Sequence, residues 1–185
     1  MKAIINTDMM KALALMTPKN AVRSCLNAIY VSDRHAVVAH DHYMVLVNVP
    51  EFEGEGYCYL LPEWVKGIKE NSVTIETLDN GTIVNGVTYP KYDQGRYPDY
   101  RRVIPEKTSG DPAKYNLQYL SMFAKVEKLI TIPGGLTIHQ NGDSAAVITC
   151  DTREYFLGLL MPMRDGNNGP FDTPSWAFNR EEAAR

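Results

Sequence analysis

The stretch Gly95-Arg96-Tyr97-Pro98-Asp99-Tyr100-Arg101-Arg102-Val103-Ile104-Pro105 is the most distinctive in the chain, because it places three arginines, two tyrosines and two prolines between two apolar regions. Pro98 fixes its own φ and favours an extended Tyr97, and Pro105 has the same effect on Ile104. We therefore expect a stiff, extended link that presents its side chains to a ligand. The simpler interpretation is a structural linker whose arginines pair with surface carboxylates.

Length and composition favour one full domain with a smaller module, since the chain has 185 residues, 44% of them hydrophobic and 22% charged. The net charge of -3 argues against a nucleic-acid footprint over the whole surface, but allows a local basic face. The start Met1-Lys2-Ala3 opens no long apolar run, so we expect a cytoplasmic protein without membrane contact. Cys25, Cys58 and Cys150 are expected to be buried thiols.

Residues 1–105 show the order strand, helix, three strands twice. The first copy, residues 1–52, comprises a strand at 2–6, a helix capped by Thr7 or Asp8 and stopped by Pro18, and strands at 28–32, 35–39 and 44–49. The second, residues 56–105, comprises a strand at 57–61, a helix at 63–69 after Pro62, and a meander over 72–89 with turns at Asn80-Gly81 and Asn85-Gly86. The two copies predict one complete domain.

A third copy of the unit, residues 113–164, follows a polar linker at 106–112. It comprises a strand at 113–117, a helix at 118–130, and strands at 136–140, 145–150 and 155–161 with turns at Asn141-Gly142 and Asp151-Thr152. A repeat of about fifty residues indicates a modular architecture. We expect an α+β fold with antiparallel sheets and helices on one face, a half domain at 113–164, and a flexible tail at 165–185.

Three segments resemble the bacterial DNA polymerase III β sliding clamp family. Residues 96–105 are similar to the family's link between its second and third domains, and Leu160-Met161-Pro162-Met163-Arg164 to its C-terminal strand and tail. Val22-Arg23 with Leu26-Asn27, followed by Val38-Ala39 and Asp41, resembles the start of its second domain. The resemblance implies clamp-like repeats that bind DNA and proteins without cofactor or catalysis. Only three of the six units of a clamp chain are recognisable, so the family's head-to-tail dimer is in doubt.

The resemblance implies a surface pocket that receives short peptides of DNA polymerase, the clamp loader and repair proteins. Mapped onto this sequence, its walls come from the first unit, the link and the third unit, and all three contributing segments are present. The mapped residues are Leu26, His40, His42, Tyr43, Met44, Val45, Pro98, Arg102, Val103, Leu159, Leu160, Met161, Pro162, Met163 and Arg164. His42, Tyr43 and Met44 replace the family's Gly, His and Arg, so the peptide preference is expected to differ.

The resemblance also implies that helices line a hole through which double-stranded DNA passes, with basic side chains facing its backbone without reading sequence. The corresponding cations are Lys11, Lys19, Arg23, Lys66, Lys69, Lys125 and Lys128. Glu63, Glu70 and Glu127 interrupt this set, and ordinary solvated helix faces are the simpler interpretation.

Other classes of function find little support. His40-Asp41-His42 places two imidazoles on one face of a strand, but no further ligands follow at metal-site spacing, and no phosphate loop, GxSxG or paired catalytic carboxylate motif is present. Two binding functions remain open. A clamp ring has twelve units, so three per chain favour a homotetrameric ring, whereas a single chain that retains the pocket would act as a decoy for clamp-binding peptides.

Overall fold

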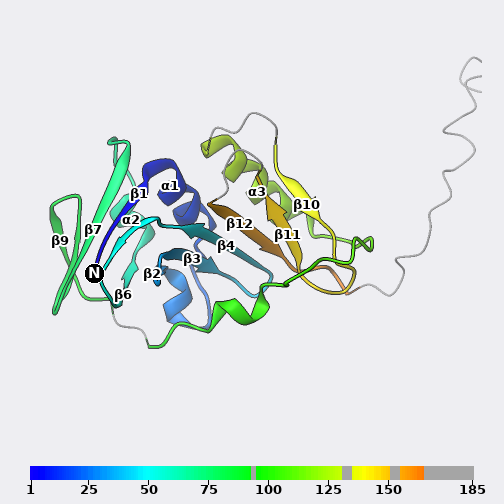
Figure 1. The fold of residues 1–185 in the computed structure, drawn as a ribbon, viewed down its shortest axis with the longest axis horizontal. Helices are drawn as coiled ribbons and strands as arrows, with labels where there is room; N and C mark the ends of the chain where they lie inside the picture. Colours follow the sequence, from blue (N-terminus) through cyan, green and yellow to red (C-terminus); the bar gives the residue numbers. More distant parts are fainter. Residues whose placement is uncertain (93–94, 131–134, 151–154, 165–185) are drawn as a thin grey trace, which may run out of the picture.

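The computed structural model describes residues 1–92, 95–130, 135–150 and 155–164 (Figure 1). The predicted tail at 165–185 and the predicted turn at Asp151-Thr152 lie outside the described residues. None of the helices in the described part of the chain has the length and apolar character needed to cross a membrane.

The first unit follows its predicted order. Its elements are β1 (Lys2–Asn6), α1 (Thr7–Met16), a short 3-10 helix η1 (Ser24–Asn27), β2 (Ile29–Ser32), β3 (His35–Ala39) and β4 (Tyr43–Asn48). The predicted helix cap at Thr7 or Asp8 is wrong, because the side chain of Asn6 accepts hydrogen bonds from the N–H groups of Asp8 and Met9. Asn6 therefore ends β1 and starts α1 in one step.

The second unit differs from the prediction in its helix. Its elements are β5 (Glu51–Glu53), β6 (Tyr57–Leu60), α2 (Pro62–Val65), β7 (Ser72–Leu78), β8 (Gly81–Val84) and β9 (Val87–Pro90). The expected helix over 63–69 is reduced to one turn, which is followed by Gly67 at a φ of +84°, a conformation that helices do not continue through. The strand β5, which lies at the boundary between the first two units, was not predicted.

The third unit consists of α3 (Leu117–Leu129), β10 (Thr137–His139), β11 (Ala146–Thr149) and β12 (Phe156–Leu160). The predicted strand at 113–117 is wrong, since residues 113–116 form no strand and Leu117 already belongs to α3. A strand requires a hydrogen-bonded neighbour, and the corresponding strands β1 and β6 have one in β7 and β2. The described part of this chain offers no equivalent neighbour to residues 113–116.

The link between the second and third units is only partly extended. A short 3-10 helix, η2 (Tyr100–Val103), interrupts it, and the N–H of Ile104 donates to the carbonyl of Arg101. The expectation of a fully extended link is thus wrong for these four residues. Pro98 and Pro105 flank the turn rather than lie within it, so neither proline prevents it.

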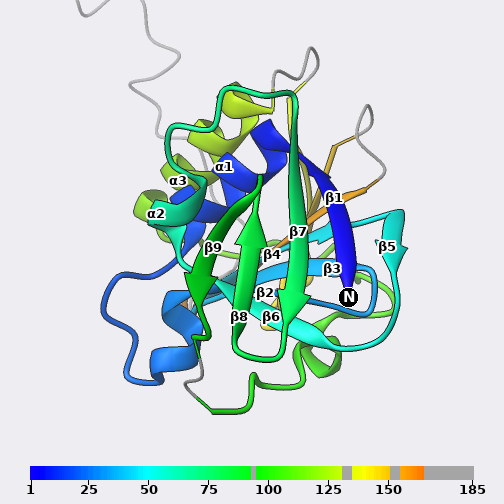
Figure 2. The same cartoon turned by 90° about the vertical axis from the view of Figure 1, so that its left-hand side faces the viewer.

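The strands form two antiparallel sheets that exchange strands between units. The five-stranded sheet has the order β5-β1-β7-β8-β9 (Figure 2). The seven-stranded sheet has the order β10-β11-β12-β4-β3-β2-β6. Each of the first two units therefore lends its first strand to the other unit's sheet. The third unit joins the first through β12 and β4, with Leu159 opposite Met44.

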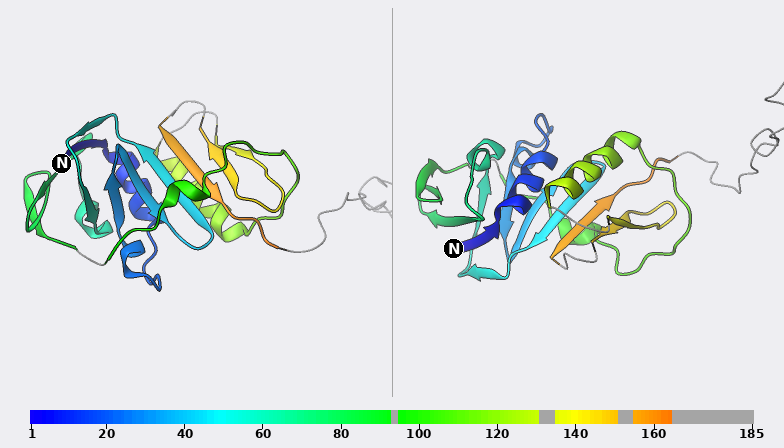
Figure 3. Two further views of the ribbon diagram at one scale, coloured as in Figure 1. Left: turned by 60° about the horizontal axis from the view of Figure 1, so that its bottom comes forward. Right: turned by 90° about the horizontal axis from the view of Figure 1, so that it is seen from above.

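Helices α1 and α3 lie beside one another over the seven-stranded sheet, and α1 also contacts α2 (Figure 3). The core lies between helices and sheets and includes Met9, Leu13 and Met16 from α1 and Phe123 and Val126 from α3, all buried. Burial of these side chains provides most of the stabilisation. The chain therefore has the α+β class predicted for it, with helices on one face of antiparallel sheets.

We expect Gly158→Ala to destabilise the protein. Gly158 lies in β12 opposite Val45, and a Cβ there would lie 2.6 Å from Cε1 of Phe123 and 3.1 Å from Cβ of Ile148. Relief of this overlap requires α3 to shift, which should cost about 1 to 3 kcal/mol in the free energy of unfolding. Denaturant unfolding would measure it, with exposed Thr88→Val in β9 as the control. Equal stability of the two variants would contradict the close packing of α3 on β12.

Candidate functional site

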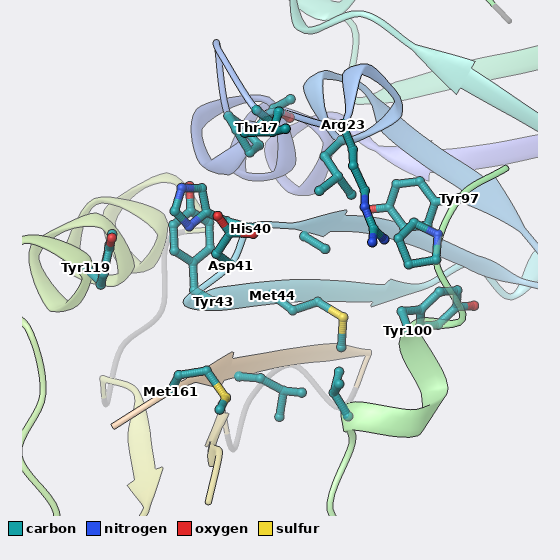
Figure 4. Close-up of a pocket in the computed structure, with 18 of the residues that line it drawn as sticks. Thr17, Arg23, His40, Asp41, Tyr43, Met44, Tyr97, Tyr100, Tyr119 and Met161 are labelled. Atoms are coloured by element: carbon teal, nitrogen blue, oxygen red, sulfur yellow. The ribbon is translucent and has the colours of Figure 1, made fainter. Parts of the chain in front are cut away.

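A pocket of about 910 Å³ lies where the first unit, the link and the third unit meet (Figure 4). The loop after α1, the start of β4 and the link each provide one wall, and α3 and β12 provide another. In Figure 4, His40, Tyr43 and Tyr119 lie at one end and Tyr97 and Tyr100 at the other, with Met44 between them. The pairing of β4 with β12 thus brings distant segments together, so that Leu15 and Met161, 146 positions apart in the chain, line one cavity.

Just over half of the residues expected to form a peptide site line this pocket. They are Leu26, His40, Tyr43, Met44, Pro98, Val103, Leu159 and Met161. Met44 and Leu159 face each other across the β4–β12 pair and belong to the same buried cluster. The side chains that the sequence assigned to three separate segments therefore share one cavity.

The other expected residues do not line the pocket. Val45 and Leu160 are fully buried in the cluster on the helix side of the sheet, because side chains alternate between the two faces of a strand. Arg102 is exposed and pairs with Asp99 at 3.2 Å. Met163 and Arg164 are also exposed, and Pro162 is half-buried. The last expected residue that does not line the pocket is His42.

Sequence reasoning missed several residues that line the pocket. Tyr119 and Met122 of α3 were interpreted only as part of a helix. In the loop from Thr17 to Val22, only Pro18, Lys19 and Val22 had been singled out, and none of them for the pocket. Tyr119 follows the helix start by two residues, and its helical spacing gave no sign that it would face a neighbouring unit. The pocket is consequently more aromatic than the resemblance implied.

At one end of the pocket, His40, Tyr43 and Tyr119 line the cavity, and the His42 ring packs against His40 and Tyr119 without lining it. The His40 ring stacks on Tyr43 with centroids 4.7 Å apart and planes inclined by 6°, and Tyr119 lies 5.4 Å from both Tyr43 and His42. The N–H of His42 donates to Nδ1 of His40 at 3.3 Å, and the Tyr43 hydroxyl donates to the carbonyl of Met16 at 2.9 Å. These contacts hold the rings in fixed orientations.

Burial controls the ionisation of this cluster. It raises the pKa of Tyr43 to about 12, with a further contribution from Tyr119, so the phenol stays protonated. Burial also lowers the pKa of His40, and neighbouring His42 acts in the same direction, while Asp41 opposes both. Around neutral pH the rings of His40 and Tyr43 are therefore uncharged.

The opposite end of the pocket is held by the link. Tyr97 is buried and stacks on Tyr30 of β2 with centroids 4.5 Å apart, and Tyr100 receives or donates a hydrogen bond with Nδ1 of His35 at 3.0 Å. Arg101 pairs with Asp33 in the β2–β3 turn at 2.8 Å, and this hydrogen bond lowers the pKa of the Asp33 carboxyl. These contacts fix the link against the first unit and so shape the pocket wall.

The rim of the pocket exposes apolar side chains. Leu15, Val22 and Val103 are large hydrophobic residues that remain exposed although they line the cavity. A concave apolar surface with a few polar groups is typical of sites that bind ligands with apolar anchors. The polar groups here include Lys19, Arg23 and Asp41.

The cations assigned to DNA contact divide into two groups. Lys11 lies on α1, Lys125 and Lys128 on α3, and Lys66 and Lys69 in the segment just after α2. The other two, Lys19 and Arg23, line the pocket instead. Among the described residues, no group of three or more His, Cys, Asp or Glu side chains is arranged to hold a metal ion.

No protein-family model matches the chain, and no curated protein matches it. Solved structures of bacterial clamps do. DNA polymerase III subunit beta from Borrelia burgdorferi matches with a TM-score of 0.63 and 15% identity over 90% of this chain and 65% of its own. Caulobacter crescentus pol III beta matches with a TM-score of 0.67 and 14% identity over 89% of this chain and 66% of its own. The DNA polymerase sliding clamp from Bacillus subtilis matches with a TM-score of 0.64 and 13% identity over 89% of this chain and 64% of its own.

The chain therefore has the fold of the bacterial sliding clamps, as the resemblance of its motifs implied. It spans about 65% of the length of the clamp chains it matches. The likeness concerns the fold, because the sequence identities are between 13% and 15%.

We expect stability to decrease as the pH falls from about 7 to about 5. Burial lowers the pKa of His35 and His40 below 6.5, so the unfolded chain binds protons first once the pH falls below that value. Asp33, whose pKa lies below 3.8, acts only at lower pH. Thermal unfolding of His35→Gln/His40→Gln should show a smaller loss between these two pH values than the unsubstituted protein. An equal loss in both proteins would contradict this assignment.

Proposed function

We propose that the chain is a cytoplasmic, non-enzymatic, sliding-clamp-like processivity factor whose pocket binds short peptides of replication proteins. The observation that carries this proposal is the convergence of the first unit, the link and the third unit on one apolar cavity. Segments that lie far apart in the chain build a single concave surface, which neither a core nor a linker requires. DNA polymerase and the clamp loader are the proposed partners.

The chemistry of the pocket suits a peptide with aliphatic and aromatic anchors. Met44, Leu159 and Met161 provide adaptable apolar surface, and the rings of Tyr43 and Tyr119 can pack against an aromatic side chain. Most of the binding energy of such a peptide comes from its buried anchors, while polar groups orient it. His40, with Nδ1 occupied by the N–H of His42, can donate from Nε2 to a peptide carbonyl.

We expect Met161→Ala to weaken peptide binding about tenfold, which is ~1.4 kcal/mol. The substitution removes a thioether that lines the cavity, while the N–H of residue 161 still donates to the carbonyl of His42. Fluorescence anisotropy of a labelled peptide with aliphatic and aromatic anchors would measure the affinity. Met163→Ala is the matched control, because Met163 is 43% exposed and does not line the pocket. Equal affinities of both variants, or no saturable binding by the unsubstituted protein, would refute the site.

The proposed ring binds double-stranded DNA through its backbone, without sequence preference. Support comes from five lysines on or just after the three helices, which lie on one side of the sheets. Such contacts release counterions and depend strongly on salt. Glu63, Glu70 and Glu127 on the same elements reduce the local positive charge, so a closed ring rather than affinity would hold the protein on DNA.

We expect better retention on circular DNA than on the same DNA linearised, because a ring slides off free ends. Lys125→Glu/Lys128→Glu should weaken the salt-dependent contact, whereas Lys107→Glu, an exposed residue of the linker, should not. Gel filtration of protein loaded on each form of DNA would measure retention. Equal retention on both forms would rule out encirclement.

A decoy that captures clamp-binding peptides as a single chain is the second candidate function. It is favoured by one observation: the pocket forms where segments of a single chain meet, so peptide binding does not require a second copy. Light scattering separates the two functions, since a ring requires an oligomer and the decoy requires only a monomer that still binds peptide.

A further inference from the structure

Strand pairing between units follows two rules in this chain. In the first kind of contact, the first strand of one unit pairs with the second strand of its mate, reciprocally: β1 with β7, and β6 with β2. In the second kind, the last strands of two units pair with each other, as β4 does with β12. All of these pairs are antiparallel, so both kinds of contact are compatible with a two-fold relation between the units.

Among the described residues, the third unit makes only the second kind of contact. Its second strand, β10, is the end strand of the seven-stranded sheet. All three residues of β10 are exposed, with Ile138 39% exposed, whereas the equivalent strands β2 and β7 bury alternate or most residues. Leu117, at the start of α3, is 78% exposed. The third unit therefore presents an uncovered surface where the first two units have a mate.

Residues 113–116 are placed for the missing pairing. They precede α3 as β1 precedes α1, and the N–H of Met163 donates to the carbonyl of Lys114 at 2.8 Å. Met163 follows β12 just as β5 follows β4, and β5 flanks β1 on the side away from β7. One edge of residues 113–116 is thus flanked as in the first unit. On the other edge the N–H of Ala113 donates to Oε1 of Gln140 at 2.9 Å, but no strand pairs there among the described residues, which leaves room for a strand of a second copy.

The opposite end of the molecule has the complementary deficiency (Figure 1). β9 is the last strand of the second unit and the end strand of the five-stranded sheet. Three of its four residues are exposed, including Val87 at 53%, whereas the last strands β4 and β12, which pair with each other, are mostly buried. In the described part of the chain, β9 is the one last strand without a strand on its outer side.

We propose that copies of this chain assemble through two self-complementary contacts, third unit to third unit and β9 to β9. In the first, residues 113–116 of each copy pair with β10 of the other. The third unit requires a mate whose first and second strands are also unpaired with another unit. Strand β9 requires another last strand whose outer edge is also unpaired. In each case the only described surface that qualifies is its own copy on another chain, which makes both contacts isologous.

These contacts alternate correctly around a closed assembly. Along each chain the order is second, first, third unit, and the two kinds of contact alternate between them. If one neighbouring copy is joined through the third units and the other through the β9 edges, the two kinds of contact keep alternating around the assembly. This holds for any even number of copies. That the number is four rests on the ring proposed above. A head-to-tail contact would instead set β9, a last strand, against the third unit's second strand, a pairing that this chain shows nowhere.

The test uses one charged substitution in each contact. Ile138→Lys should block the third-unit contact and Val87→Lys the β9 contact, and both side chains are already exposed, so folding should persist. Light scattering should give a tetramer for the unsubstituted chain, a dimer for each single variant and a monomer for the double variant. Leu78→Lys, at a 42% exposed position outside both contacts, should remain a tetramer.

Three outcomes would overturn the arrangement. If each single variant is a monomer, the contact is heterologous and β9 meets the third unit, although the ring itself survives. If the unsubstituted chain is monomeric at all concentrations, the ring fails as well, while peptide binding by that monomer would leave the pocket intact. If neither substitution changes the mass of an oligomer, other surfaces form it.

Cysteine pairing tests the strand register directly. In the β1–β7 pair, the residue before α1 lies opposite the first residue of β7, and the same register places Lys114 opposite His139 of the second copy. Lys114→Cys/His139→Cys should oxidise to a disulfide-linked dimer, and neither single substitution should, since the native thiols are buried. Absence of the link in an assembled protein would overturn the pairing of residues 113–116 with β10.

Discussion

The antiparallel pairing of β12 with β4 is the contact on which the rest of the structure depends. It joins the third unit to the first in one continuous seven-stranded sheet, and it sets α3 beside α1. Because Leu159 and Met44 lie opposite each other, the outer face of this pair becomes the floor of the pocket. The same pairing therefore provides both cohesion between the units and the proposed binding surface.

The pocket combines an apolar floor with ends that are fixed by hydrogen bonds. Tyr43 is tied to the end of α1 through Met16, and the link is tied to the β2–β3 turn through Arg101 and Asp33. A surface fixed in this way loses little conformational entropy when a ligand binds. The bulky rings of His40, Tyr43 and Tyr119 at one end restrict the shape of the ligand that can enter there.

Much of the fold was predictable from the sequence, since apolar alternation and turn residues predicted every strand of the described part of the chain except β5, and Tyr119 to Ile130 had helical spacing. The errors have local physical causes. Asn6 caps α1 although Thr7 and Asp8 are equally good caps, and Gly67 follows a helix of only one turn. Residues 113–116 have strand character in sequence but lack a partner. Val45 and Leu160 were assigned to the pocket by their position, whereas strand alternation directs them to the core. The contribution of Tyr119 depends on how two units dock, which no local pattern encodes.

The pairing of β4 with β12 also bears on how the protein is synthesised. Leu159 follows its partner Met44 by more than a hundred residues, so β4 leaves the ribosome long before the strand that covers it. During that interval the largely apolar β4 is an open sheet edge, of the kind that pairs indiscriminately with other chains. The first two units can exchange strands and fold early, but the nascent chain then exposes the unpaired edge of β4 until β12 emerges. Slow elongation between residues 50 and 160 would therefore favour aggregation, and shielding by a chaperone would be most useful in that window.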